Sequence, residues 1–179
     1  MGRPLRTAAL VAIVVVVALG YARISQEKGF ALPNGTAVPP LTLPSLSGGE
    51  VNLSSYRGKV VVLNFWATWC PPCVAEMPSL QRLHRSLAPE GLAVVTVSTD
   101  SDEETLREFV SDHDLTLPVL LDPGGRTAAS VYLVTGYPET FIVDPEGLLL
   151  HHSTGPAEWD TPEALAHLRA LLEPTVASP

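Results

Sequence analysis

The chain has only two cysteines in 179 residues, Cys70 and Cys73, and this scarcity limits its thiol chemistry. A structural zinc site needs two further ligands, and the sequence has neither a second cysteine pair nor a His-x-x-x-His run. A purely structural disulfide is also disfavoured, because closing so short a loop removes little entropy from the unfolded chain. The sequence therefore favours a redox-active pair.

Positive charge is scarce as well. Lysine and arginine total 11 against 19 aspartate and glutamate residues, which gives a formal net charge of −8. This balance argues against a nucleic-acid partner. No internal repeat is visible, and a hydrophobic fraction of 46% is enough for one domain to bury a core.

Near the N-terminus the sixteen residues from Thr7 to Ala22 are uncharged and mostly apolar, and they lie between Arg6 and Arg23. A helix of that length spans about 24 Å, short of the roughly 30 Å hydrocarbon core, but flanking arginines can snorkel to the interface. The run also resembles the apolar region of a signal peptide. We therefore predict a transmembrane anchor or signal sequence over residues 1–23, with an uncleaved anchor favoured over a cleaved, secreted form.

In either case the basic end stays in the cytoplasm and the rest is exported, so we expect a single-pass membrane protein with its domain on the extracytoplasmic side. The leader contains no cysteine, which excludes a lipoprotein anchor, and no adjacent arginines, so a twin-arginine signal is not supported. Residues 24–38 contain Pro33 and Asn34-Gly35 without periodicity and predict a linker. A globular domain over residues 39–173 and a flexible tail over residues 174–179 follow.

The two cysteines lie between a predicted strand and a predicted helix. Val60 to Trp66 is apolar on nearly every position, as expected for a central strand covered on both faces. Helical periodicity follows Cys73. Cys70 is therefore expected where the helix begins, and there the unpaired N–H groups and the helix dipole lower the pKa of a thiol. Pro71 and Pro72 lack N–H groups, so the Cys73 N–H is expected to matter most for the Cys70 thiolate.

The remaining elements predict an α/β fold in which one mixed sheet is flanked by helices on both faces. Residues 92–97 are expected to pair in parallel with the central strand. The sequence Ser101 to Glu104 resembles a capping box, and Thr161 with Pro162 is expected to begin the last helix. The other predicted elements are strands at 41–46, 51–53, 118–122, 140–143 and 148–151, and a short helix at 127–133. This order, with the CxxC at the first helix, is the thioredoxin arrangement.

Two motifs carry a resemblance to a known family. The segment from Val62 to Cys73, Val-Leu-Asn-Phe-Trp-Ala-Thr-Trp-Cys-Pro-Pro-Cys, followed by Glu76 and Pro78, resembles the signature of the membrane-anchored, thioredoxin-like thiol-disulfide oxidoreductases typified by TlpA, ResA and CcmG (DsbE). The segment from Gly136 to Phe141 resembles their second signature. The likeness implies an extracytoplasmic protein-disulfide reductase without a cofactor or metal. It implies a membrane electron donor of the CcdA or DsbD kind, and a client such as the oxidised CxxCH of apocytochrome c.

The resemblance also implies roles for individual residues. Cys70 would be the attacking nucleophile, and Cys73 would resolve the mixed disulfide, so that the two form the redox-active disulfide. Pro138 would be a cis-proline that faces the pair, where a substrate strand can add. Glu76 would exchange protons with Cys73, unless it is an ordinary solvated carboxylate of the helix.

Three neighbouring residues are also predicted at the substrate site: Trp69, Tyr137 and Glu139. For Trp69 the alternative is a lid over the helix start, and for Glu139 it is a turn residue. Asn64 stands where ordinary thioredoxin has a buried aspartate that accepts a proton, and an amide cannot do so, which would pass the task to Glu76. His151 and His152 are predicted to be surface residues.

The same residues are compatible with other functions. The same chemistry could run in the oxidising direction, as in DsbA, because sequence does not fix the redox potential. A copper-binding assembly module for a respiratory oxidase could use Cys70, Cys73 and a histidine, since thiolates suit Cu(I). Peroxidase activity is disfavoured, because thioredoxin-like peroxidases have a different cysteine environment.

Overall fold

The computed structural model describes residues 32–173. The predicted anchor, most of the predicted linker and the C-terminal tail lie outside this range. Within residues 32–173 no helix is long and apolar enough to cross a membrane.

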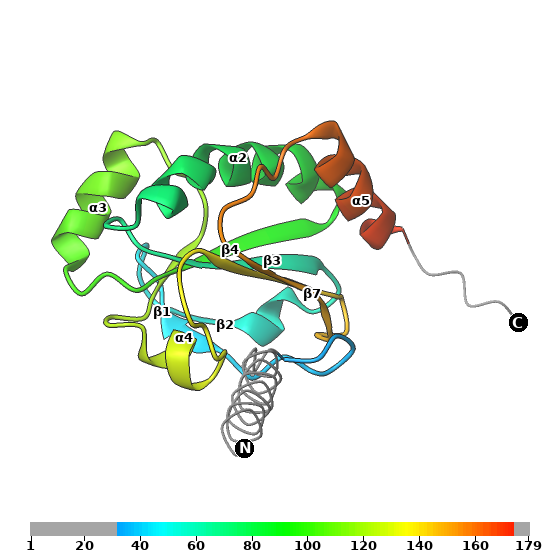
Figure 1. Ribbon diagram of the computed structural model, residues 1–179, viewed down its shortest axis with the longest axis horizontal. Helices are drawn as coiled ribbons and strands as arrows, with labels where there is room; N and C mark the ends of the chain where they lie inside the picture. The colour runs from blue at the N-terminus through cyan, green and yellow to red at the C-terminus, as the bar shows by residue number, and fades with distance from the viewer. Residues whose placement is uncertain (1–31, 174–179) are drawn as a thin grey trace, which may run out of the picture. The chain divides into compact units, whose positions relative to one another are not determined.

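A five-stranded mixed sheet forms the centre of the domain, in the order β5-β4-β3-β6-β7 (Figure 1). The central strand β3 pairs in parallel with β4 and antiparallel with β6, and all seven of its residues are buried. This arrangement confirms the predicted mixed sheet. The strands are β3 (Val60–Trp66), β4 (Leu92–Ser98), β5 (Val119–Leu121), β6 (Glu139–Val143) and β7 (Leu149–Thr154).

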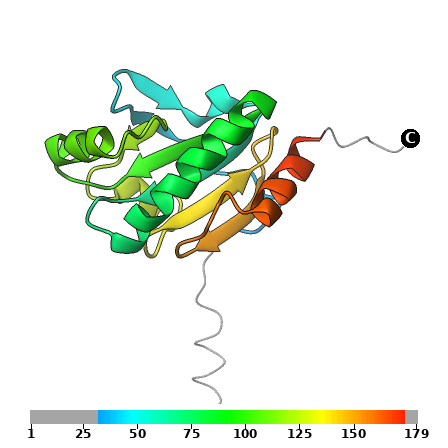
Figure 2. The same cartoon turned by 90° about the horizontal axis from the view of Figure 1, so that it is seen from above.

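Helices cover both faces of the sheet, as predicted. Helices α2, α3 and α5 lie on one face, and the short helix α4 lies on the other with the β1–β2 hairpin (Figures 1 and 2). Two hydrophobic cores result, because successive side chains of a strand point to opposite faces. The helices are α2 (Pro71–Leu87), α3 (Glu103–Asp112), α4 (Arg126–Ser130) and α5 (Pro162–Leu172).

The residues of β3 divide between these cores. Val62 and Trp66 pack toward α2, whereas Leu63 and Phe65 pack toward α4 and the hairpin. Asn64 is two residues from both Val62 and Trp66, and alternate residues of a strand point to the same face of the sheet. Its polar side chain therefore lies on the face covered by α2. It is fully buried there.

Helix starts follow the sequence signals with one correction. Thr161 accepts a hydrogen bond from the Ala164 N–H and begins α5, as predicted. For α3 the N-cap is Asp102, whose side chain accepts from the Glu104 N–H, and not Ser101. The predicted capping box is therefore wrong by one residue, because the carboxylate of Asp102 takes the free N–H group.

The chain joins the domain earlier than the predicted linker boundary. Gly35 donates to the Leu149 carbonyl at 2.7 Å, and Val38 donates to the Gly147 carbonyl at 3.0 Å. These bonds place the last residues of the predicted linker beside the β6–β7 turn. The strands predicted at 41–46 and 51–53 pair with each other as an antiparallel hairpin, formed by β1 (Thr42–Pro44) and β2 (Glu50–Asn52).

Candidate active site

Cys70 and Cys73 lie where β3 gives way to α2, as the sequence predicts. Cys70 is the N-cap of the 17-residue helix, and its sulfur accepts a hydrogen bond from the Cys73 N–H at 3.3 Å. The two residues form a disulfide, with their Cα atoms 5.3 Å apart. Cys73 is fully buried, whereas Cys70 keeps 5% of its surface exposed. A thiolate on Cys70 would therefore accept a hydrogen bond from the Cys73 N–H and would also be stabilised by the positive end of the helix dipole.

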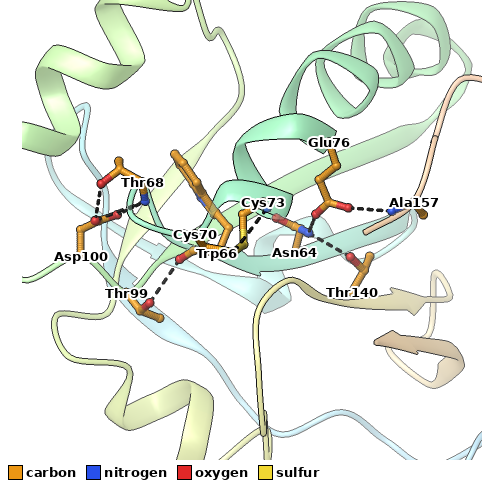
Figure 3. The surroundings of a disulfide bond; sticks show 10 residues. All are labelled: Asn64, Trp66, Thr68, Cys70, Cys73, Glu76, Thr99, Asp100, Thr140 and Ala157. Atoms are coloured by element: carbon orange, nitrogen blue, oxygen red, sulfur yellow. Dashed lines mark hydrogen bonds between the residues drawn. A yellow bond between two sulfur atoms is a disulfide. The ribbon is translucent and has the colours of Figure 1, made fainter. Parts of the chain in front are cut away.

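A buried carboxylate supports the turn before the pair. Asp100 follows β4 and accepts from the Thr68 N–H at 3.0 Å and from the Thr68 hydroxyl at 2.6 Å (Figure 3). It also accepts from the Ser98 hydroxyl at 2.7 Å. Sequence analysis missed this residue. The parallel pairing of β3 and β4 could have indicated it, because the carboxyl ends of parallel strands meet at one edge of the sheet.

Glu76 is enclosed behind the disulfide and is not a solvated helix carboxylate. It is 2% exposed and accepts from Asn64 Nδ2 at 2.7 Å, from the Ala157 N–H at 3.1 Å and from Trp159 Nε1 at 3.3 Å. Burial raises the pKa of this carboxyl, and these three hydrogen bonds oppose that effect by favouring the charged form.

Asn64 connects Glu76 to the neighbouring strand. Its Nδ2 also donates to the Thr140 hydroxyl of β6 at 2.9 Å (Figure 3). Its Oδ1 is buried and has no hydrogen-bond partner among the described residues. The amide thus links the helix that carries the cysteines to the strand that follows Pro138.

The peptide bond between Tyr137 and Pro138 is cis, which confirms that part of the prediction for Pro138. Pro138 immediately precedes β6, and the Glu139↔Phe65 register places it at the same edge of the sheet as Cys70. Tyr137 meets Trp69 edge to face, with ring centroids 5.8 Å apart. Trp69 is 64% exposed, so these aromatic rings form an accessible surface beside the disulfide.

Glu139 lies below this surface rather than on it. It is 2% exposed, and its Oε1 accepts from the Thr135 N–H at 2.8 Å and the Gly136 N–H at 3.2 Å. Its Oε2 lies 2.8 Å from His152 Nε2. The predicted direct contact of Glu139 with substrate does not fit this burial, because both oxygens already bind the protein's own groups.

The prediction that both histidines lie on the surface is half wrong. His151 is exposed, but the side chain of His152 is only 14% exposed and stacks on Phe141, with centroids 4.3 Å apart. Sequence analysis missed His152, because its position depends on the pairing of β7 with β6.

Within residues 32–173, no group of three or more histidine, cysteine, aspartate or glutamate side chains is arranged to hold a metal. The copper hypothesis requires a histidine beside the two cysteines, and His152 is bound to Glu139 instead. The described geometry therefore gives that hypothesis no third ligand.

Comparisons with known proteins agree with this chemistry. Residues 34–152 match the AhpC/TSA family. The thiol-disulfide oxidoreductase ResA of Oceanobacillus iheyensis is 36% identical over 141 residues, which cover 75% of this chain and 73% of ResA. A structure from Chlorobium tepidum, described as a thiol:disulfide interchange protein DsbE, has a TM-score of 0.73 at 31% identity and covers 79% of this chain and 99% of its own.

A second solved structure is that of a secreted thiol-disulfide isomerase from Corynebacterium glutamicum. It has a TM-score of 0.69 at 28% identity and covers 80% of this chain and 96% of its own. The family match over residues 34–152 and the identity to ResA place this chain in the AhpC/TSA family, as a thiol-disulfide oxidoreductase of the ResA and DsbE type.

Proposed function

We propose that the protein reduces disulfides of exported proteins, with the CxxCH disulfide of apocytochrome c as the expected client. The observation that carries the proposal is the placement of Cys70 as the N-cap of α2, with its sulfur on the Cys73 N–H. This environment stabilises the thiolate, which is both the attacking species and a good leaving group.

The reaction proceeds by two exchanges. The Cys70 thiolate attacks one sulfur of the client disulfide, the client S–S bond breaks, and a mixed disulfide forms while the other client sulfur leaves as a thiolate. The Cys73 thiolate then attacks the Cys70 sulfur of the mixed disulfide and releases the second client thiolate. Two electrons pass to the client, both client sulfurs take up protons, and the Cys70–Cys73 disulfide is restored.

Glu76 is the expected proton acceptor for Cys73 in the second exchange. Cys73 is fully buried, so its thiol needs an acceptor inside the protein before it can attack. Burial raises the pKa of Glu76, which brings its proton affinity closer to that of a thiol than an exposed carboxylate would have. Asn64 cannot take this role, since an amide does not accept a proton at ordinary pH.

The client is expected to bind on the surface formed by Trp69, Tyr137 and Pro138. Trp69 offers an exposed ring that is already held against Tyr137. The backbone beside cis-Pro138 can pair with an extended client segment, a recognition mode in which main-chain hydrogen bonds give affinity. The sulfur of Cys70 would then face the client disulfide.

The uncharged run at the N-terminus supports an extracytoplasmic location, because it has the length of an export signal and can serve as an anchor when its flanking arginines snorkel to the interface. The similarity to a secreted isomerase agrees with export. Each reduced client leaves the Cys70–Cys73 pair oxidised, so an electron donor must restore the dithiol. In a membrane-attached protein that donor is expected to be a membrane carrier of the CcdA or DsbD kind.

Trapping tests the assigned roles. A Cys73→Ala variant should accumulate a mixed disulfide with its client in membranes, and a Cys70→Ala variant should not. Mass spectrometry of the trapped species identifies the client. Equal trapping by both variants would overturn the assignment of nucleophile and resolving residue.

The oxidising direction, as in DsbA, is the second candidate, because the same N-cap contact that favours the Cys70 thiolate also stabilises the reduced protein. A redox titration of the full chain against glutathione separates the two. A potential well below about −180 mV supports the reductase, and one well above that value supports the oxidase.

A further inference from the structure

We propose that His152 is a positioning residue for the client. Through Glu139 it holds residues 135–138, the segment that presents Tyr137 and Pro138 beside the cysteine pair. The proposal rests on the proposed function, because it concerns how that site binds a protein client.

Glu139 binds the segment from below at adjacent backbone groups. Its Oε1 accepts from the Thr135 N–H at 2.8 Å, the Thr135 hydroxyl at 3.1 Å and the Gly136 N–H at 3.2 Å. Charge-assisted bonds of this kind are stronger than neutral ones. One buried oxygen atom therefore fixes the backbone just before the cis peptide bond.

His152 fixes the other carboxylate oxygen. Its Nε2 lies 2.8 Å from Glu139 Oε2, and the side chains of the two residues are 14% and 3% exposed. The imidazole stacks on Phe141 with an interplanar angle of 10°, so the ring has little freedom to turn its nitrogen away. His152 thus sets the orientation of the Glu139 carboxylate, which holds the segment 135–138.

The loop meets the reactive edge directly. Tyr137 contacts the exposed ring of Trp69, and Trp69 precedes Cys70 in the chain. The Pro138 carbonyl also accepts from the Gly155 N–H at 2.8 Å, just after the end of β7. Residues 135–138 are therefore supported twice from this side, once by His152 of β7 and once by the backbone of Gly155.

Three variants separate positioning from other effects. His152→Phe keeps a ring that can stack on Phe141 but removes the contact with Glu139. His152→Gln keeps an N–H donor and should restore part of that contact. His151→Phe is the matched control, because His151 is the exposed neighbour on the same strand.

The prereduced full chain is assayed with two substrates, an oxidised Cys-x-x-Cys-His peptide and a small aromatic disulfide. Binding of the peptide depends on the segment 135–138, whereas reduction of the small disulfide depends only on the Cys70 thiolate. For His152→Phe we expect the half-saturating peptide concentration to rise about tenfold, since a small misplacement of a binding group has effects of this size or larger. The rate at which His152→Phe reduces the small disulfide should stay unchanged. The half-saturating peptide concentration of His152→Gln should lie between those of the parent chain and His152→Phe, and that of His151→Phe should equal the parent value.

A readout that does not depend on activity is amide hydrogen exchange at Thr135 and Gly136. Both amides should exchange faster in His152→Phe, and at the parent rate in His151→Phe. Three results for His152→Phe would each overturn the proposal: an equal loss of activity with both substrates, an unchanged half-saturating peptide concentration, or unchanged amide exchange at Thr135 and Gly136. If the parent chain reduces the small disulfide but not the peptide, the proposed function fails, and the exchange measurement still decides whether His152 holds the loop.

Discussion

Replacement of Glu76 by glutamine tests the electrostatics of the site most sharply. The carboxyl is 2% exposed, and burial raises its pKa despite three N–H donors. Glutamine has nearly the same shape and no charge, so the substitution isolates the cost of burying the charged form. The new amide oxygen can accept from the Ala157 N–H and Trp159 Nε1. Its NH2 group can donate to the unpartnered Oδ1 of Asn64 after the Asn64 amide rotates.

The expected sign follows from linkage. Because the pKa of Glu76 is higher in the folded than in the unfolded state, its contribution to stability is fully present below the unfolded-state pKa. That contribution is lost as pH rises through the folded-state pKa. Between the two values, the free energy of unfolding of the parent chain falls relative to that of Glu76→Gln. One proton accounts for at most about 1.4 kcal/mol per pH unit.

The assay is urea unfolding of the full chain in its oxidised form, at intervals from about pH 4 to about pH 8, which covers ordinary and raised carboxyl values. The difference in unfolding free energy between Glu76→Gln and the parent should shift in favour of the variant as pH rises, and then level off. Glu146→Gln, a change at an exposed turn residue, should show no such upward shift. If the difference in unfolding free energy stayed constant with pH, or moved in favour of the parent as pH rises, the three hydrogen bonds would offset or outweigh the effect of burial on the pKa of Glu76.

Three further substitutions have expected outcomes. Asp100→Ala should cost about 3 kcal/mol in urea unfolding, since the Thr68 N–H loses its buried charged acceptor. Trp69→Ala should change stability by less than about 0.5 kcal/mol, because the side chain is 64% exposed, yet peptide reduction should slow several-fold in stopped-flow measurements. Gly125→Ala should cost about 1–2 kcal/mol, because the residue has a φ of +68°. Its added Cβ would lie 2.5 Å from the Tyr137 hydroxyl, so reduction of the peptide, but not of a small disulfide, should also slow.

The sheet and helices were predictable because their signals are local. The apolar run Val60–Trp66 and the helical periodicity after Cys73 each describe one element, and their order leaves few ways to build a covered sheet. The N-cap position of Cys70 followed from the same boundary. The cis bond before Pro138 was predicted from the family resemblance alone.

The features that were missed depend on how distant strands pair. His152 reaches Glu139 only through the register of β7 with β6, and Asp100 reaches Thr68 only because β3 and β4 end together. Aspartate is mostly exposed in proteins and histidine is intermediate in burial, so residue type alone gives no warning that these two side chains are enclosed. The pairing of Val38 with the β6–β7 turn was missed for the same reason, because prolines and glycine around it indicated a linker.

The proposed function requires the Cys70–Cys73 pair to pass two electrons to a protein disulfide. Mass spectrometry of the prereduced full chain, mixed with an equal amount of an oxidised Cys-x-x-Cys-His peptide and quenched with an alkylating reagent, tests it directly. We expect the peptide thiols to become alkylated while Cys70 and Cys73 become protected as a disulfide, in equal proportion. Alkylation of both cysteines with the peptide still oxidised would contradict it.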